Sequence, residues 1–564
     1  MNERRIIFVS FLFIIGFFII IFRLVDLQTR DKEILEELIK KQYIREEKVI
    51  LPRGAIYDSN GNILAISIPK LTVFAIPKYI KDKEKVSEEL SKILKISKEN
   101  ILRKLEKHKS YVVISDSVDK SLKKEIEALR YRLKEWNIGL LDNSKRIYPF
   151  DELAGSTIGF VNKITGKGAE GLEYKYNSIL GGGLKKIRFI ADATGKPLHI
   201  IDTLDNISQS KDIVLTIDSN IQHIAEEVLN KYVKLRKPKG ALILIVDPNT
   251  GDIVANATYP NYNPNRYWKY KIRKNITFQN AYEPGSLAKP FVLAKAIESR
   301  NIDLEKKYFC EWGKIVIDNV RIKDHTPFGE LTVRDIIVHS SNVGIIKIAL
   351  EENPKELYDL FFKLGFGKST GTFPGETSGK LRRNYLPVNV AYLSIGQSWT
   401  ASPIQIAMAY SSIANGGLLL KPRILKKVID KKTGKIEENK PTVIRRVFRR
   451  ETTDILKGVL LDVVEKGTAK RGKSKFYTIA GKTGTAQKYD PELKRLSTEK
   501  YYTWFAGFFP VTNPKYTIVI LFDEPQKIGE KEKIGGGSVS APILRDLVDR
   551  IMFYKKIKPD KSGN

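Results

Sequence analysis

The stretch Tyr282-Glu-Pro-Gly-Ser286-Leu-Ala-Lys289-Pro-Phe-Val-Leu-Ala-Lys-Ala-Ile297 decides how this chain is interpreted. A Pro-Gly pair ends the preceding segment and the apolar spacing afterwards is helical, so Ser286 is predicted in the first turn of a helix. Lys289 follows three residues on, and positions i and i+3 share a helix face about 5–6 Å apart. Serine attacks only when a base takes its proton, and a buried lysine beside a second cation can be that base. The spacing therefore predicts a serine nucleophile, a lysine base and another lysine nearby.

The serine-lysine spacing is not specific by itself in a lysine-rich chain. It recurs at five other places, which we interpret as solvated surface serines: Ser67/Lys70, Ser117/Lys120, Ser121/Lys124, Ser208/Lys211 and Ser497/Lys500. Ser286 differs because it alone follows a Pro-Gly break and opens an apolar helix. Two further motifs also come after it in order.

The first later motif is His339-Ser340-Ser341-Asn342-Val-Gly. The Ser340 hydroxyl is suited to relaying protons, and the Asn342 amide is suited to holding both a substrate and the lysine base. This motif therefore supplies the polar groups that a serine-lysine pair lacks.

The second later motif is Ile479-Ala-Gly-Lys482-Thr483-Gly484-Thr485-Ala486, which the preceding apolar residues predict as a strand entering the site. Lys482 is expected to supply positive charge, and the hydroxyls of Thr483 and Thr485 to bind a carboxylate. Gly484 is expected to let substrate approach the backbone. A second Lys-Thr-Gly, at residues 432–434, lies in a charged run and is interpreted as a surface turn.

Composition gives weaker information. The chain has 564 residues, enough for two or three cores, and 97 basic against 65 acidic residues give a net charge of +32. Nucleic-acid binding is disfavoured because the basic residues are spread along the chain without a recognition motif. Cys310 is the single cysteine, which excludes an intrachain disulfide. The charge suits acidic lipid or an acidic wall polymer, or a heat-adapted surface.

The predicted organisation is α+β with one membrane anchor. Residues 6–22 contain no charge and are long enough for the hydrocarbon core, so 1–25 are predicted as a short cytoplasmic end with an uncleaved anchor. Residues 26–210 are predicted as a strand-rich, non-catalytic pedestal with helical stretches near 81–109 and 120–135. Strands at both ends of 211–557 enclose helices, which predicts an antiparallel sheet packed on helices, and 558–564 are predicted as a disordered tail.

The three motifs, in this order, resemble the active-site set of penicillin-binding proteins and class A β-lactamases. Over essentially its whole length the chain is similar to class B penicillin-binding proteins, the peptidoglycan DD-transpeptidases. Three segments resemble the non-catalytic boxes of that family and imply a pedestal domain: Arg53-Gly-Ala-Ile-Tyr-Asp58-Ser-Asn-Gly61, Arg146-Ile-Tyr148-Pro149 and Gly171-Leu-Glu173-Tyr-Lys-Tyr176-Asn. The segments around Ser286, Ser340 and Phe505 look most similar to the FtsI-type septal enzyme, penicillin-binding protein 3.

The resemblance implies a mechanism without metal or cofactor. Ser286 would attack the penultimate D-Ala carbonyl of a stem peptide, with Lys289 as general base and the backbone N–H groups of Ser286 and Thr485 as oxyanion hole. Ser340 would pass the proton to the leaving amine, Asn342 would anchor substrate and Lys289, and Lys482 would hold Lys289 neutral. The resemblance also implies β-lactam binding, a catalytic domain outside the cytoplasmic membrane, and an FtsW-type lipid II polymerase with other division proteins as partners.

Departures from the family pattern put substrate preference and β-lactam affinity in question. Leu287-Ala288 stands where Thr-Phe is usual, Ser59 replaces an arginine of the first box, and Ser394-Ile-Gly-Gln-Ser-Trp399 has serine where glycine is common.

Several alternatives stay open from the sequence. An elongation-type class B enzyme is close to the septal interpretation, and a β-lactam sensor or scaffold would share the same fold. A Ser-His-Asp hydrolase is disfavoured because only His339 of five histidines adjoins a motif. A phosphate loop near Gly365 is disfavoured because Phe362 stands where glycine is required.

Overall fold

The computed structural model describes residues 3–29, 44–108, 111–191, 197–204, 210–271, 273–490 and 495–561. They form two compact units, the first made of Met1–Pro52, Ser67–Lys145 and Gly182–Ser208, the second of Arg53–Ile66, Arg146–Gly181 and Gln209–Asn564. The domain boundary predicted between residues 210 and 211 stays a prediction. The compact units divide differently, because two segments from the first 210 residues fold with the second unit.

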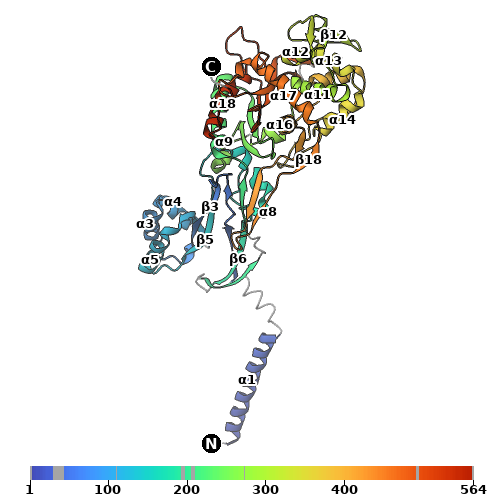
Figure 1. The fold of residues 1–564 in the computed structure, drawn as a ribbon. Coiled ribbons are helices and arrows are strands. Elements are labelled where there is room, and N and C mark those ends of the chain that lie inside the picture. The colour runs from blue at the N-terminus through green and yellow to red at the C-terminus, as the bar shows by residue number, and fades with distance from the viewer. Residues whose placement is uncertain are drawn as a thin grey trace. The chain divides into compact units, whose positions relative to one another are not determined.

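The N-terminal helix α1 (Glu3–Thr29) contains the predicted apolar run (Figure 1). Its segment Arg5–Thr29 is the one helix, among the residues that the structure describes, long and apolar enough to cross a membrane. Its 25 residues span about 37 Å at 1.5 Å per residue, more than a hydrocarbon core of about 30 Å requires. The helix therefore fits the predicted anchor, of which residues 1 and 2 lie outside the described residues.

The first unit combines a small α/β core with a separate ribbon of strands. β3 (Ile63–Ala75) pairs antiparallel with β4 (Val112–Asp119) and also pairs with β5 (Ile138–Ile147). The helices predicted near 81–109 and 120–135 are confirmed as α3 (Lys83–Leu94), α4 (Lys98–Lys107) and α5 (Lys123–Leu133). Leu90, Ile101 and Ile126 are fully buried among them. The ribbon contains β1 (Ile44–Leu51), β6 (Gly183–Ala191) and β7 (Pro197–Leu204).

The second unit is built on a five-stranded antiparallel sheet in the order β10-β9-β21-β20-β19. Its strands come from both ends of the domain, as predicted: β9 (Gly240–Val246), β10 (Ile253–Tyr259), β19 (Ala480–Asp490), β20 (Arg495–Phe509) and β21 (Tyr516–Asp523). β9 and β21 are buried at every residue, so both faces of the sheet are covered. The third sequence motif lies on β19, which is an edge strand of this sheet among the described residues.

Helices surround this sheet (Figure 1). α9 (Ser219–Arg236) and α18 (Ala541–Tyr554) pack together, and α16 (Pro403–Ala414) contacts β9, β20 and β21. Asp218 caps α9, as predicted, by accepting hydrogen bonds from the backbone N–H groups of Asn220 and Ile221. Two further helices begin at motif residues, α11 (Lys289–Arg300) and α13 (Asn342–Leu350). The unit also contains α6 (Gly155–Ile158), α7 (Gly171–Lys175), α8 (Asn177–Leu180), α10 (Ile276–Gln279), α12 (Val333–Val338), α14 (Pro354–Lys363), α15 (Pro387–Ile395) and α17 (Arg450–Glu465).

The three segments that resemble non-catalytic boxes meet in a buried ionic cluster of the second unit. Glu173, which is fully buried, accepts from Arg53 Nε at 3.0 Å and from Arg146 Nε at 2.7 Å. Tyr148 donates its hydroxyl to the same carboxylate at 3.2 Å. The two arginines share this one carboxylate, and each also donates to a backbone carbonyl, Arg53 to Gly181 at 2.5 Å and Arg146 to Gly54 at 2.8 Å. Both buried guanidinium groups are thus paired and hydrogen-bonded, which burial of a charge requires.

The tail predicted over 558–564 is only partly described. Residues 562–564 lie outside the described residues, but Asp560 accepts from the backbone N–H of Thr478 at 2.7 Å. Lys561 Nζ donates to Glu465 at 2.5 Å and to the Ser474 carbonyl at 3.0 Å. Asp560 and Lys561 are therefore held, against the prediction, on the segment that leads into β19.

Candidate active site

Ser286 lies in a single 3₁₀ turn (Gly285–Ala288) that continues directly into α11, whose first residue is Lys289. Gly285 has φ +57°, a conformation that glycine adopts without strain, and a Cβ there would lie 2.9 Å from the Thr485 carbonyl oxygen. This glycine lets the nucleophile turn lie against β19. In the described part of the chain the Ser286 hydroxyl has no hydrogen-bond partner, so it is open to a substrate.

The Lys289 amine joins the first two motifs. Its Nζ lies 2.6 Å from the Ser340 carbonyl oxygen, 2.7 Å from Asn342 Oδ1 and 3.2 Å from Ser340 Oγ. A neutral amine has two N–H donors and one lone pair. It can therefore donate to the Ser340 carbonyl and to Asn342 Oδ1 and keep its lone pair free for a proton, whereas the ammonium form donates to Ser340 Oγ as well.

A residue that sequence reasoning missed holds the Ser-x-Asn motif. Asp324 follows strand β13 (Val320–Lys323) and accepts from the Ser341 hydroxyl at 2.7 Å, from the Asn342 backbone N–H and from the Val343 backbone N–H at 3.1 Å. Ser340 has φ +64° in the left-handed region, where a residue with a side chain is strained. Asp324 fixes the turn immediately after Ser340. No sequence signal marks Asp324, because its contacts with this motif join segments that are distant in the sequence.

Lys482 is fully buried on β19 and donates to the Thr483 carbonyl at 3.1 Å. The Thr483 hydroxyl lies 2.7 Å from that of Thr468, and the Thr485 hydroxyl accepts from the Gly536 N–H at 3.0 Å.

Gly484 makes room for the nucleophile turn. A Cβ on it would lie 2.8 Å from the Pro284 carbonyl oxygen and 3.1 Å from Leu287 Cγ. The expectation that substrate approaches the backbone at this glycine stays a prediction. The glycine is needed because the nucleophile turn fills that space.

Burial lowers the pKa of both lysines. The pKa of Lys289 falls from 10.5 to about 7 because burial disfavours the ammonium, an effect that the Asp324 carboxylate partly opposes. Burial, and then the charge of Lys289, lower the pKa of Lys482 well below 10.5. Burial thus favours the neutral form of both amines.

An open groove of about 1530 Å³ contains the exposed parts of these motifs. It is lined by residues of all three motifs and by Asp324, among them Ser286, Ser340, Asn342, Thr483 and Thr485. His325 and His339 also line it, but in the described part of the chain no histidine is hydrogen-bonded to Ser286. The alternative Lys-Thr-Gly at 432–434 lies in an exposed turn between β16 (Leu425–Ile429) and β17 (Ile436–Glu438), as predicted.

The departures from the family pattern differ in burial: Ser59 is half-buried and Ser398 is exposed, whereas the other positions lie in the core. Leu287 and Ala288 have no exposed surface, and Trp399 is 3% exposed, with its indole N–H donating to the Leu393 carbonyl. Leu287, Ala288 and Trp399 therefore act on the groove through packing.

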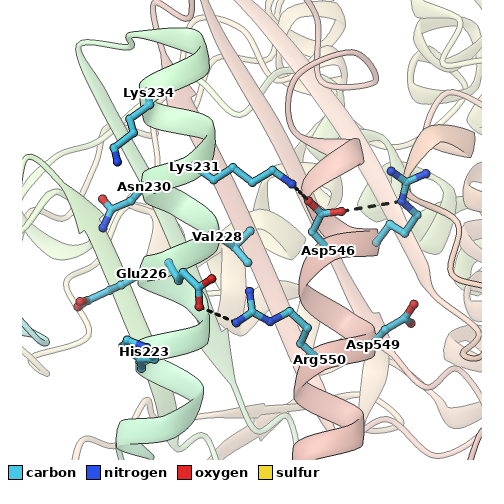
Figure 2. Close-up of a pocket in the computed structure, with 11 residues that line it drawn as sticks. His223, Glu226, Val228, Asn230, Lys231, Lys234, Asp546, Asp549 and Arg550 are labelled. Atoms are coloured by element: carbon cyan, nitrogen blue, oxygen red, sulfur yellow. Dashed lines mark hydrogen bonds and ion pairs between the residues drawn. The ribbon is translucent and has the colours of Figure 1, made fainter.

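A second hollow, between α9 and α18, carries none of the motifs. Figure 2 shows Lys231 of α9 reaching Asp546 of α18, a pair at 2.5 Å. Arg550 pairs with Glu227 at 2.6 Å. The charges of these pairs compensate one another across the two helices, which is typical of a solvated helix pair.

Comparison with known proteins agrees with this arrangement. Residues 241–549 match the family described as penicillin binding protein transpeptidase domain, and residues 48–215 match the penicillin-binding protein dimerisation domain. The chain is 32% identical to the Neisseria gonorrhoeae protein named "Probable peptidoglycan D,D-transpeptidase PenA", covering 99% of this chain and 94% of PenA. It is 30% identical to the peptidoglycan D,D-transpeptidase FtsI of Buchnera aphidicola, covering 99% and 95%. The crystal structure of penicillin-binding protein 2X from Streptococcus thermophilus matches with TM-score 0.78 at 24% identity, over 90% of this chain and 80% of that one.

Proposed function

The chain belongs to the penicillin-binding protein transpeptidases, and from this membership we propose the residue roles, orientation and cellular role given below. It is a peptidoglycan D,D-transpeptidase, an enzyme that cross-links stem peptides and is a target of β-lactams. With its one apolar N-terminal helix it is a single-pass membrane protein.

In the proposed acylation, Ser286 Oγ attacks the carbonyl of the penultimate D-Ala and its proton passes to neutral Lys289. The backbone N–H groups of Ser286 and Thr485 stabilise the developing oxyanion, a contribution whose loss costs about 100- to 1000-fold in other enzymes. The C–N bond breaks as Ser340 passes a proton to the leaving D-Ala nitrogen. An ester on Ser286 and free D-Ala result.

In the proposed second half, the amine of a neighbouring stem attacks the ester carbonyl. A new peptide bond forms and Ser286 leaves with a proton. The hydroxyls of Thr483 and Thr485 hold the donor, Gly484 keeps the strand against the nucleophile turn, and Lys482 helps to hold Lys289 neutral. No step requires a metal or cofactor.

One observation carries these roles: the buried Lys289 amine contacts both Ser340 and Asn342 at hydrogen-bond distance, and its pKa is lowered to about 7. A base that is half neutral near neutral pH suits general-base chemistry. The chain therefore has an active serine-lysine set, which argues against the sensor or scaffold alternative.

The roles are tested by covalent labelling with a fluorescent penicillin. Ser286→Ala is expected to abolish labelling of the full chain, whereas Ser121→Ala, at an exposed serine-lysine pair, is expected to leave it unchanged. If the Ser286→Ala variant were still labelled, the proposed mechanism would be refuted.

The catalytic domain is proposed to lie outside the cytoplasmic membrane, because uncross-linked stem peptides are there. A septal role is supported by the FtsI relatives, although other relatives include the stage V sporulation protein D of Bacillus subtilis. An FtsW-type polymerase and division proteins are the proposed partners. A fluorescent fusion should concentrate at mid-cell, and a lateral-wall pattern would favour the elongation-type alternative.

A further inference from the structure

One surface segment of the second unit has an unusual composition. Residues 266–274 contain five basic and three aromatic residues, and no aspartate or glutamate occurs between Asp252 and Glu283. Over the whole chain, by contrast, 65 acidic residues accompany 97 basic ones. The segment is therefore a local excess of positive charge rather than a sample of the average surface.

The segment is held in place by packing and hydrogen bonds. The Tyr267 ring stacks on Phe160 with centroids 3.8 Å apart, and the Arg273 guanidinium lies 5.5 Å from the Phe160 ring. Asn265 Nδ2 donates to the Tyr148 carbonyl at 2.9 Å, which ties the segment to the ionic cluster. Neighbouring side chains are therefore presented in a fixed arrangement.

This scaffold presents two large apolar side chains to solvent. Trp268 is 52% exposed and Ile164 is 80% exposed, and Lys163 Nζ, from the residue before Ile164, lies 3.5 Å from the Trp268 ring. We call Lys163, Ile164, Arg266, Trp268, Lys269 and Lys271 the basic-aromatic patch. Tryptophan and arginine are the residues that most often anchor protein interfaces.

Three cations of the basic-aromatic patch have no partner in the part of the chain that the structure describes: the side chains of Arg266, Lys269 and Lys271 make no hydrogen bond or ion pair there. Two acids of the same unit make other contacts, since Asp151 accepts from Asn263 and Asn265 and Glu152 accepts from the Tyr270 hydroxyl. The patch is thus complementary to negative charge.

The basic-aromatic patch is separate from the catalytic groove. It follows β10, one edge of the central sheet, whereas the catalytic motif lies on β19, the opposite edge. Five strands spaced by about 4.8 Å put the two edges about 19 Å apart, and the groove lining includes no residue of the patch. An occupant of the patch can therefore be bound during turnover.

We propose that the basic-aromatic patch docks an acidic segment of a partner protein, with an apolar side chain against Trp268 and Ile164 and carboxylates on the surrounding cations. A fixed arrangement of rings and charges suits a protein surface of matching shape. A lipid surface is a poorer occupant, because interfacial binding uses a broad apolar face and the described residues of the patch expose two large apolar side chains, Trp268 and Ile164.

Photo-crosslinking in growing cells tests this docking. The full chain carries p-benzoylphenylalanine at Trp268 or, as a control, at Tyr131, which is 68% exposed in the first unit. We expect a protein adduct at 268 and not at 131, with a cross-linked partner peptide of net negative charge by mass spectrometry. Lys269→Glu with Lys271→Glu should reduce this adduct at least about tenfold.

The matched charge control is Lys432→Glu with Lys440→Glu, at two exposed lysines on either side of β17, which should leave the adduct unchanged. Penicillin labelling should be unchanged in both charge variants, because neither touches the groove. The proposal is overturned if position 268 gives no more protein adduct than position 131, if the adduct is only with lipid or glycan, if the partner peptide is not acidic, or if both charge pairs reduce it equally.

Discussion

Labelling by a fluorescent penicillin should accelerate about tenfold between pH 6 and pH 8. Because the pKa of Lys289 is about 7, this amine is neutral in about 9% of molecules at pH 6 and about 91% at pH 8. At an ordinary pKa of 10.5 it would be neutral in only about 0.3% at pH 8. The depression corresponds to about 5 kcal/mol in favour of the neutral form.

The assay is the second-order acylation rate constant, measured by stopped flow from pH 5.5 to 8.5 with a penicillin that does not titrate in this range. The reasoning predicts a single rise with its midpoint near pH 7. A rate that is flat, or that falls with pH, would refute Lys289 as the base with this pKa.

Asp324→Asn sharpens the same test. The Asp324 carboxylate raises the pKa of Lys289, so its loss should move the midpoint below pH 7. The amide keeps an oxygen for the N–H groups of Asn342 and Val343, and Asp454→Asn, at an exposed aspartate of α17, is the matched control. A midpoint that rises or stays in place would show that Asp324 acts only structurally.

Three further predictions concern stability, measured as the free energy of unfolding in denaturant. Burial raises the pKa of Glu226 from 4.5 to about 7, so the native state keeps a proton that the unfolded state loses, and the free energy of unfolding falls as pH rises through this window. Relative to the native chain, Glu226→Gln should therefore be more stable at pH 8 than at pH 5, by at most about 3 kcal/mol and less because water reaches this half-buried side chain. An equal stability difference at both pH values would contradict this. Glu173→Gln should cost about 3–5 kcal/mol, because two buried arginines lose their counter-charge, and a neutral effect would show that the cluster tolerates uncompensated charge. A chain ending at residue 558 should lose about 1.5–3 kcal/mol relative to one ending at 561, because the hydrogen bonds of Asp560 and Lys561 are charge-assisted, and equal stability of the two chains would show that these bonds contribute nothing.

Local patterns were sufficient for much of the fold. The hairpin of β9 and β10, the Asp218 cap of α9 and the helices of the first unit follow from apolar periodicity, turn residues and capping, which act within a few residues. The order of the three motifs likewise indicated which of six serine-lysine pairs is the nucleophile, because the other pairs lack the helix start and the later motifs.

Contacts between distant segments were not predictable in the same way. Asp324 meets Asn342 because a hairpin folds against α13, and Gly484 meets Leu287 because the nucleophile turn lies on β19. The lowered pKa values of Lys289 and Lys482 depend on burial, and the spacing of the motifs does not reveal how deeply each lysine is buried. Asp560 and Lys561 are held by hydrogen-bond partners that lie about eighty residues or more earlier in the sequence.

The most direct test of the central claim is to trap and map the acyl group from a natural donor. The full chain is mixed with a stem peptide ending in D-Ala-D-Ala, quenched in acid, digested and analysed by mass spectrometry while released D-Ala is counted. The account predicts an acyl mass on the peptide that contains Ser286, with one D-Ala released per acyl group. An acyl group on another residue, or D-Ala release that persists in Ser286→Ala, would contradict it.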